Sequence, residues 1–190
     1  MTLPHEIPPG GAAARQAAAF GALVPAIETA RLRLRAPCIG DFPAYADIAC
    51  SERGRGIGGP MSRADAWADF AMMCAGWLLR GHGLWSVDRR DNGALAGFVL
   101  LGFEPGDQAP ELGFMLCADA EGQGLAFEAA TAARDHARTL GLPGLVSYVA
   151  RDNHRSSALA RRLGGRPDPS ALPAGADDLA FRYFGAGGAA

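Results

Sequence analysis

Residues 110–126 read Pro-Glu-Leu-Gly-Phe-Met-Leu-Cys-Ala-Asp-Ala-Glu-Gly-Gln-Gly-Leu-Ala, and this stretch decides which fold the sequence specifies. An apolar run typical of a β-strand comes first, two glycines separated by one residue follow, and an alanine-rich helix pattern begins directly afterwards. The first N–H groups of a helix have no internal partner and can bind an anion together. Gly122 and Gly124 favour such a turn because glycine adopts unusual φ values without a steric penalty. The stretch predicts a site for phosphate or pyrophosphate, with an ordinary strand–helix turn as the alternative.

Two other phosphate-binding turns fit the sequence poorly. The Gly-x-Gly-x-x-Gly turn of dinucleotide-binding folds requires a third glycine near position 127, where the chain has Phe127. The phosphate loop of nucleoside triphosphatases requires a Gly-Lys-Ser/Thr sequence, and all 18 cationic side chains of this protein are arginine. A nucleotide-binding α/β protein unrelated to coenzyme A is therefore disfavoured.

The glycine turn resembles the acetyl-CoA loop of GNAT-type N-acetyltransferases, which has the spacing Gln/Arg-x-x-Gly-x-Gly/Ala. Glu121 stands in place of the usual first residue, and Gly124 and Ala126 fit the other two positions. Further stretches resemble the branch of ribosomal-protein N-terminal acetyltransferases: its opening strand at 28–35, its fourth strand at 111–114, its Asn-x-x-Ser helix at 152–156 and the glycine that ends this helix at 161–164. The resemblance covers residues 27–184 in a consistent order.

The resemblance implies a site for acetyl-CoA that is built mainly from backbone groups. It implies that N–H groups around Gln123–Ala126 hold the pyrophosphate, and that the pantetheine arm pairs like an extra strand with Met115–Cys117. Asn153 either binds this arm or only caps the helix that follows it. The residues expected to bind acetyl-CoA are Met115, Leu116, Cys117, Gly122, Gln123, Gly124, Leu125, Ala126 and Asn153. No metal ion is implied.

Transfer of an acetyl group from a thioester to an amine requires a base for the amine and a proton or hydrogen bond for the departing thiolate. Glu111, at the start of the strand that would carry the thioester arm, is the candidate base. Its alternative role is a surface carboxylate or a strand-end ion pair. Ser156 is the candidate partner of the thiolate, with a local bond in the first helical turn as its alternative. Many family members have a tyrosine seven residues after the asparagine, where this chain has Ala160.

Two functional hypotheses follow from the resemblance. The first is transfer of an acetyl group from acetyl-CoA to a primary amine, either on a small molecule or at the N-terminus of a protein or peptide. The second is a catalytically silent acyl-CoA-binding or sensing module, which the missing tyrosine favours. The acceptor would bind between the glycine-rich loop 51–60, the helix 62–81 and the loop 104–109. Loops of this kind vary freely, so they do not identify the amine.

The apolar pattern predicts an α/β (α+β) domain. Leucine and arginine alternate over 30–36, which indicates a half-exposed strand, and Asn92-Gly93 predicts a hairpin. Asp41 is expected to cap the helix after it. The expected strands are 30–36, 84–87, 95–103, 111–117, 144–150 and 178–184, and the expected helices are 41–50, 62–81, 125–140 and 155–163. Their order implies a mixed sheet with helices on both faces. The resemblance implies that this is a GNAT-like, mostly antiparallel central sheet.

Length and composition fit one enzyme-sized domain. The chain has 190 residues, 49% of them hydrophobic, which suffices for a substantial core. We expect a single N-acetyltransferase domain over 27–184, an Ala/Gly/Pro-rich tail over 1–26 and a flexible end over 185–190. The tail is expected to pack either on the domain or on a neighbouring chain, as in a homodimer.

Charge and cysteine content argue against several partners. A net charge of −2 disfavours a general nucleic-acid binder. No apolar run reaches the roughly 18–20 residues that span a membrane, and no basic segment precedes an apolar core as in a signal peptide. The cysteines lie far apart and away from histidine clusters, which disfavours zinc and favours small buried thiols in a reducing, cytoplasmic compartment. They are Cys38, Cys50, Cys74 and Cys117.

Overall fold

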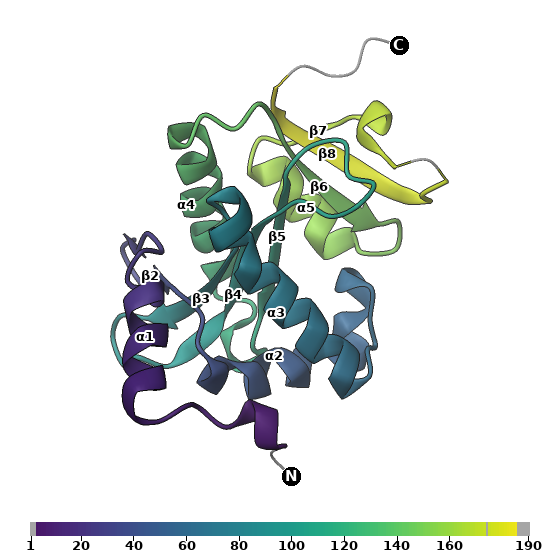
Figure 1. Ribbon diagram of the computed structural model, residues 1–190. Helices are drawn as coiled ribbons and strands as arrows, with labels where there is room; N and C mark the ends of the chain where they lie inside the picture. Colours follow the sequence, from purple (N-terminus) through teal and green to yellow (C-terminus); the bar gives the residue numbers. More distant parts are fainter. Residues whose placement is uncertain (1–2, 174, 186–190) are drawn as a thin grey trace.

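The structure, a computed structural model, describes residues 3–173 and 175–185 (Figure 1). Its centre is an eight-stranded sheet in the order β1-β2-β3-β4-β5-β6-β8-β7. The strands are β1 (Ile27–Glu28), β2 (Leu32–Arg35), β3 (Leu84–Arg89), β4 (Leu95–Gly102), β5 (Glu111–Leu116), β6 (Leu145–Ala150), β7 (Arg166–Pro167) and β8 (Asp178–Phe184). Neighbouring strands are antiparallel except β5 and β6, which are parallel. The predicted mixed, mostly antiparallel sheet is confirmed.

Helices cover both faces of this sheet (Figure 1). α2 (Phe42–Ala49) and α3 (Arg63–Arg80) pack on one face, and α4 (Leu125–Thr139) and α5 (His154–Arg162) pack on the other. The remaining helices are α1 (Gly11–Gly21) and the short 3-10 helices η1 (Pro4–Glu6), η2 (Ile39–Asp41), η3 (Glu52–Ile57), η4 (Ala118–Ala120) and η5 (Pro169–Ala171). Within residues 3–173 and 175–185, none of the helices combines the length and the apolar character needed to cross a membrane.

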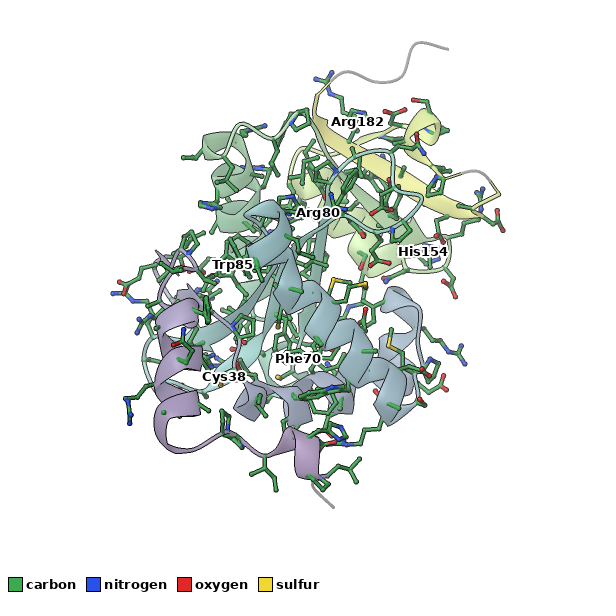
Figure 2. The ribbon with its side chains drawn as sticks, viewed as in Figure 1. Cys38, Phe70, Arg80, Trp85, His154 and Arg182 are labelled. Carbon is green, nitrogen blue, oxygen red and sulfur yellow. The ribbon has the colours of Figure 1, made fainter. Side chains whose placement is uncertain are left out.

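Two apolar cores, one on each face, follow from the alternation of side chains along the strands. Trp85 and Val99 point into the core under α4, whose buried positions are mainly alanine, so that the helix lies close to the sheet. Leu84 and Phe98, each one residue earlier, point into the core under α2 and α3, where Phe70 packs edge-on against Phe98. Figure 2 labels one residue of each core, Trp85 and Phe70.

The parallel strands β5 and β6 are joined only where they begin. Glu111 is paired with Val146, and the Val146 N–H donates to the carbonyl of Pro110 at 2.9 Å. Beyond this point no further residues of the two strands are paired. The Ser147 hydroxyl donates to the carbonyl of Leu112 in place of a backbone group. The sheet therefore opens into a gap between β5 and β6, and the open part of β5 leads directly towards the glycine turn.

The N-terminal segment, which the sequence predicts as a tail, packs on the body of the protein where the structure describes it. The buried carboxylate of Glu6 forms a two-bond ion pair with Arg63 of α3, at 2.6 and 2.9 Å. His5 lies edge-on against Trp67, and the indole N–H of Trp85 donates to the carbonyl of Pro25 at 2.8 Å. The predicted flexible end is outside the described residues from position 186 onward.

Several local predictions differ from the structure, and for Asp41 the reason is that tertiary contacts prevail over a local pattern. Asp41 does not cap α2 through its side chain, which instead accepts from Arg35, Ser86 and the N–H of Cys38. The predicted loop at 51–60 contains the helix η3. The two-residue strands β1 and β7 are too short to produce a detectable alternation.

The cysteines are less buried than predicted. Cys38 is exposed, and Cys50, Cys74 and Cys117 are half-buried. All four are free thiols. Partial burial nevertheless raises the pKa of the Cys74 thiol to about 12, so this group stays protonated near neutral pH.

Candidate active site

The glycine turn between η4 and α4 has the geometry of an anion cradle. Gly122 and Gly124 have φ of +74° and +76°, as the sequence predicts, and Gly124 is the N-cap of α4. The N–H groups from Gly122 to Phe127 find no hydrogen-bond acceptor in the described part of the chain. A Cβ atom at Gly122 would meet nothing within 4 Å, so the turn is open on its outer side. Consecutive unpaired N–H groups at a helix start favour a bound phosphate or pyrophosphate.

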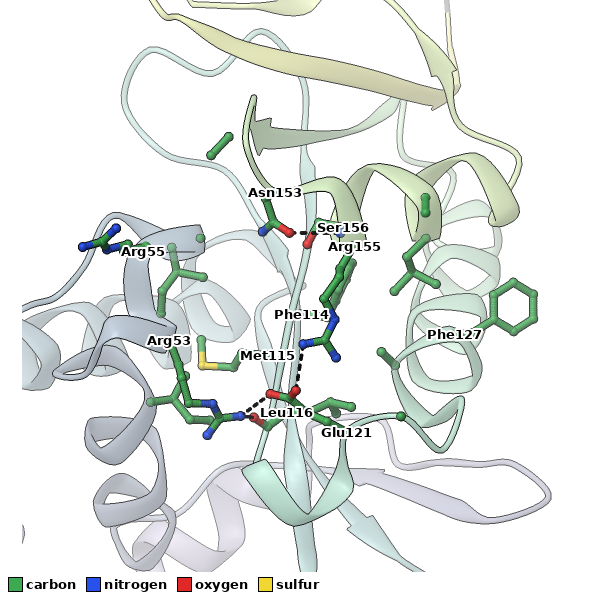
Figure 3. Close-up of a pocket in the computed structure, with 18 of the residues that line it drawn as sticks. Arg53, Arg55, Phe114, Met115, Leu116, Glu121, Phe127, Asn153, Arg155 and Ser156 are labelled. Atoms are coloured by element: carbon green, nitrogen blue, oxygen red, sulfur yellow. Dashed lines mark hydrogen bonds and ion pairs between the residues drawn. The ribbon is translucent and has the colours of Figure 1, made fainter.

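This turn forms one wall of a cavity of about 620 Å³, which we call the turn cavity. Its other walls come from η3, the end of β5 and the first two turns of α5 (Figure 3). Of the residues predicted to bind acetyl-CoA, those that line the turn cavity are Met115, Leu116, Gly122, Gly124, Ala126 and Asn153. Gln123 and Leu125 belong to the same turn but do not line it: Leu125 is buried in the core, and the Gln123 side chain bonds to Arg89 and to the carbonyl of Asp119.

The open edge of β5 lies in the turn cavity. In an antiparallel pair the backbone groups of successive residues point alternately towards and away from the partner strand. The N–H of Cys117 donates to Ala96 on the β4 side at 2.9 Å, so the backbone groups of Phe114 and Leu116 face the gap. This corrects the prediction for Cys117, which does not line the turn cavity and whose N–H is already bonded. Phe114, which the sequence analysis did not select, takes its place.

Two arginines and Glu121 connect the walls of the turn cavity, as Figure 3 shows. Arg53 of η3 donates to the Glu121 carboxylate at 2.6 Å and to the carbonyl of Leu116 at 2.7 Å. Arg155 of α5 donates to the other carboxylate oxygen at 2.9 Å. These hydrogen bonds, with Arg53 as the larger cause, lower the pKa of Glu121. The two cations outnumber the one anion, so this side of the turn cavity is positively charged beside the glycine turn.

Asn153 and Ser156 stand at the start of α5 and face the gap (Figure 3). The Asn153 side chain accepts from the N–H of Ser156 at 3.1 Å, so it caps the helix. Capping is one of the two roles predicted for this residue. The Ser156 hydroxyl makes no hydrogen bond to another described residue, which leaves it available to a ligand. Ala160, one turn further on, is buried and places no hydroxyl in the gap.

A second cavity of about 590 Å³ lies on the other side of the gap, and we call it the acidic cavity. It is lined by η3 and α3, by the loop 103–110 and by the starts of β5 and β8, close to where the sequence predicts the acceptor groove. Phe114, Met115 and Ser156 line both cavities, so the two meet at the open part of β5. A molecule in the turn cavity can therefore meet a molecule in the acidic cavity at this point.

Glu111 lies in the acidic cavity, at the only paired position of β5 and β6. Burial raises the pKa of its carboxyl to about 8, against the effect of the Tyr148 N–H, which donates to it at 3.3 Å. No ion pair with Arg or His is formed by Glu111 in the described structure, which removes the predicted alternative of a strand-end ion pair. A carboxyl with a pKa near neutrality can accept a proton from a bound amine.

Most of the predicted catalytic and binding residues thus lie around one gap, with Cys117, Gln123 and Leu125 as the exceptions. The residues that the sequence analysis missed are mostly cationic. Arg53, Arg55 and Arg155 line the turn cavity, but scattered arginines carry no motif. In the described ranges, no three side chains of His, Cys, Asp or Glu lie close enough together to hold a metal ion.

Comparison with known proteins identifies the family. The family model of the Acetyltransferase (GNAT) domain matches residues 31–166. An acetyltransferase from Agrobacterium tumefaciens is 41% identical and superposes with a TM-score of 0.81, over 85% of this chain and 95% of that one. A GnaT-family acetyltransferase from Bordetella pertussis is 23% identical, with a TM-score of 0.70 over 84% of this chain and 99% of that one. No curated protein gave a significant match.

The chain belongs to the GNAT acetyltransferase family. RimL, an α-N-acetyltransferase of a ribosomal protein, shares the fold with a TM-score of 0.65 at 19% identity, over 84% of this chain and 93% of that one. Another RimL structure contains coenzyme A. Acetyl transfer is thus the general activity of the family, and its members bind coenzyme A or acetyl-CoA.

Proposed function

We propose that this protein transfers an acetyl group from acetyl-CoA to a primary amine. One observation carries the proposal: the turn cavity and the acidic cavity meet at the open part of β5, with an anion cradle on one side and a carboxyl of raised pKa on the other. A protein that only binds acyl-CoA needs the first cavity but has no use for the second.

The turn cavity fits the donor. The unpaired N–H groups from Gly122 to Phe127 would hold the pyrophosphate, and Arg53 and Arg155 would add positive charge beside it. The free backbone groups of Phe114 and the N–H of Leu116 would pair with the amide groups of the pantetheine arm, as an added strand does. The Leu116 carbonyl is already bonded to Arg53. These contacts would place the thioester at the gap, next to Ser156.

The acidic cavity fits the acceptor. Glu111 would take a proton from the ammonium group of the acceptor, directly or through water, because a pKa of about 8 is close to working pH. The amine would then attack the thioester carbon. The unpaired N–H of Phe114 or Leu116 would donate to the carbonyl oxygen as it gains negative charge. The free Ser156 hydroxyl would donate to the departing thiolate, in the role that a tyrosine plays at position 160 in many relatives.

Release of free thiol tests the proposal. The protein would be incubated with acetyl-CoA and a panel of small amines and peptides, and coenzyme A thiol would be followed against a blank without acceptor. Acceptor-dependent thiol release is expected. A thermal shift with coenzyme A but no thiol release with any amine would instead support the silent-module alternative, for which the absence of a hydroxyl at Ala160 is the supporting observation.

A further inference from the structure

The acidic cavity is named for five carboxylates that line it. They come from four separate parts of the chain: Asp69 on α3, Glu104 and Asp107 in the loop 103–110, Glu111 on β5 and Asp178 on β8. None of the five forms an ion pair with a described Arg or His side chain, although ten other carboxylates of the protein do. The arginines therefore pair with carboxylates elsewhere, and acidic side chains without a cationic partner are concentrated in this cavity.

The cavity contains little that could neutralise this charge. Arg55 is the cation that lines it, and its guanidinium is paired with Glu52 at 2.6 Å and remains 69% exposed. Burial raises the pKa of Asp69, Glu104 and Asp107, and the charges of Asp69 and Asp107 add to the effect on Glu104. The carboxylates thus repel one another across the cavity, and a bound cation would relieve that repulsion.

The remaining lining is mostly apolar, with the free Ser156 hydroxyl as a donor where the cavity meets the turn cavity. Met61, Met73, Phe98, Leu100 and Val149 form the walls between the carboxylates. The Tyr45 hydroxyl donates to Asp69, so it is not a free donor. A ligand rich in carbonyl groups, such as a peptide backbone, would find few partners here. The methylene groups of a ligand would find apolar side chains to pack against, and its N–H donors would find carboxylates to accept their hydrogen bonds.

The carboxylates are spread around the cavity rather than gathered at a point. No three of them converge in the way that a metal ion requires, within the ranges that the structure describes. The cavity also meets the turn cavity at Phe114, Met115 and Ser156, so a ligand bound in it would lie beside the acetyl donor. The occupant must then carry positive charge at more than one position along an apolar chain.

We propose that the acceptor is an aliphatic polyamine, with its reactive nitrogen at Glu111 and a second ammonium group held by Asp69, Glu104 and Asp107. This inference rests on the proposed function of the same site. In the reaction the primary ammonium group loses one proton to Glu111, and the resulting amine forms a C–N bond to the acetyl carbon. The C–S bond breaks with its electron pair on sulfur. The nitrogen then loses its second proton, which passes to the thiolate to give free coenzyme A. The products are a mono-acetylated polyamine and the thiol.

The test compares acceptors that differ in the second charge. Initial rates of thiol release would be measured with spermidine, 1,4-diaminobutane, butylamine and a peptide with a free N-terminus. The kcat/KM for 1,4-diaminobutane should exceed that for butylamine by about tenfold or more, the effect of one charge-assisted hydrogen bond. Raising the ionic strength should reduce this ratio, because salt screens the attraction.

Two variants test whether the carboxylates of the acidic cavity cause the preference for diamines. The double variant Asp69→Asn/Glu104→Gln removes two carboxylates from the lining of the acidic cavity and should lower the diamine-to-monoamine ratio of kcat/KM by about tenfold. Asp91→Asn removes one exposed charge in the β3–β4 hairpin, outside the cavity, and should leave the ratio unchanged. The thermal shift with coenzyme A would confirm that each variant is folded and binds the donor.

A binding measurement separates the two proposals from each other. Spermidine should raise the melting temperature of the protein with coenzyme A present, and the double variant should lose that shift. Equal kcat/KM for diamine and monoamine, or a preference for the peptide that the double variant keeps, would overturn the polyamine assignment and leave acetyl transfer standing. A spermidine shift without thiol release from any amine would overturn the acetyltransferase proposal instead.

Discussion

Replacing Glu111 with glutamine should lower activity and raise stability at the same time. Burial raises the pKa of Glu111 to about 8 in the folded protein, whereas the value in the unfolded chain is 4.5. Between pH 4.5 and about pH 8, Glu111 keeps its proton in the folded protein but has lost it in the unfolded chain. The free energy of unfolding therefore decreases as pH rises from 4.5 to about 8, and above that this group makes no further difference.

The size of the effect follows from that interval. About 2.5 pH units separate 4.5 from pH 7, and each unit corresponds to 1.36 kcal/mol, so the buried carboxyl costs about 3 kcal/mol at pH 7. Glutamine has the same shape without the charge, and Glu111→Gln should gain up to this amount. The same change removes the base, and kcat should fall by roughly 10²–10⁴-fold. The loss should shrink at high pH, where the amine is deprotonated without help.

Urea denaturation of both proteins between pH 5 and pH 8 measures the stability difference, and steady-state rates over the same range measure the activity. The difference in free energy of unfolding should increase with pH. Glu28→Gln is the control for activity, because the Glu28 side chain on β1 is 60% exposed and lines neither cavity, so kcat should stay unchanged. A pH-independent difference for Glu111→Gln would refute the burial argument, and near-wild-type turnover at neutral pH would refute the role as base.

Other expected outcomes concern the donor site, the leaving group and the N-terminal segment. Gly124→Glu places a carboxylate beside the anion cradle and should abolish the thermal shift with coenzyme A; a retained shift would contradict the cradle. Ser156→Ala should lower kcat about tenfold or more, on the scale of a charged hydrogen bond, and should leave urea stability nearly unchanged because the backbone N–H, not the hydroxyl, bonds to Asn153. The hydrogen bond from Arg63 lowers the pKa of Glu6 to about 2, so this pair stabilises the protein above pH 4.5 and should lose its effect as pH falls towards 2. Trp67 fluorescence should follow that release, and Arg63→Met should remove its pH dependence.

The sequence predicts the parts of the site that depend on local backbone chemistry. A glycine turn before a helix requires positive φ, and Gly122 and Gly124 have it. Asn153 precedes a helix and caps it, as its type favours. Strong periodicity likewise predicts the long helix α3 and the β3–β4 hairpin. These features need only neighbouring residues, so one sequence is enough.

The parts that the sequence does not predict depend on distant contacts. Arg53 reaches the carbonyl of Leu116, 63 positions away, and no motif marks either residue. Trp85 and Pro25 are 60 positions apart, and Glu6 and Arg63 are 57 apart, so the docking of the N-terminal segment leaves no local pattern. The unpaired carboxylates around Glu111 are also scattered along the chain, and only the fold shows that they share a cavity.

Along the gap, the interior strand β5 presents unpaired backbone groups, as the edge strand of a sheet does. Unpaired strand edges invite pairing with strands of other protein molecules, which leads to aggregation. Here the free backbone groups of Phe114 and the N–H of Leu116 are recessed between η3 and α5 (Figure 3), and a neighbouring protein strand with bulky side chains on both faces cannot lie flat against them. A thin, unbranched chain can lie flat against these groups. The fold thus provides a site for strand addition that admits only a narrow chain. The amide hydrogens along this part of β5 should exchange rapidly with solvent until such a chain binds and protects them.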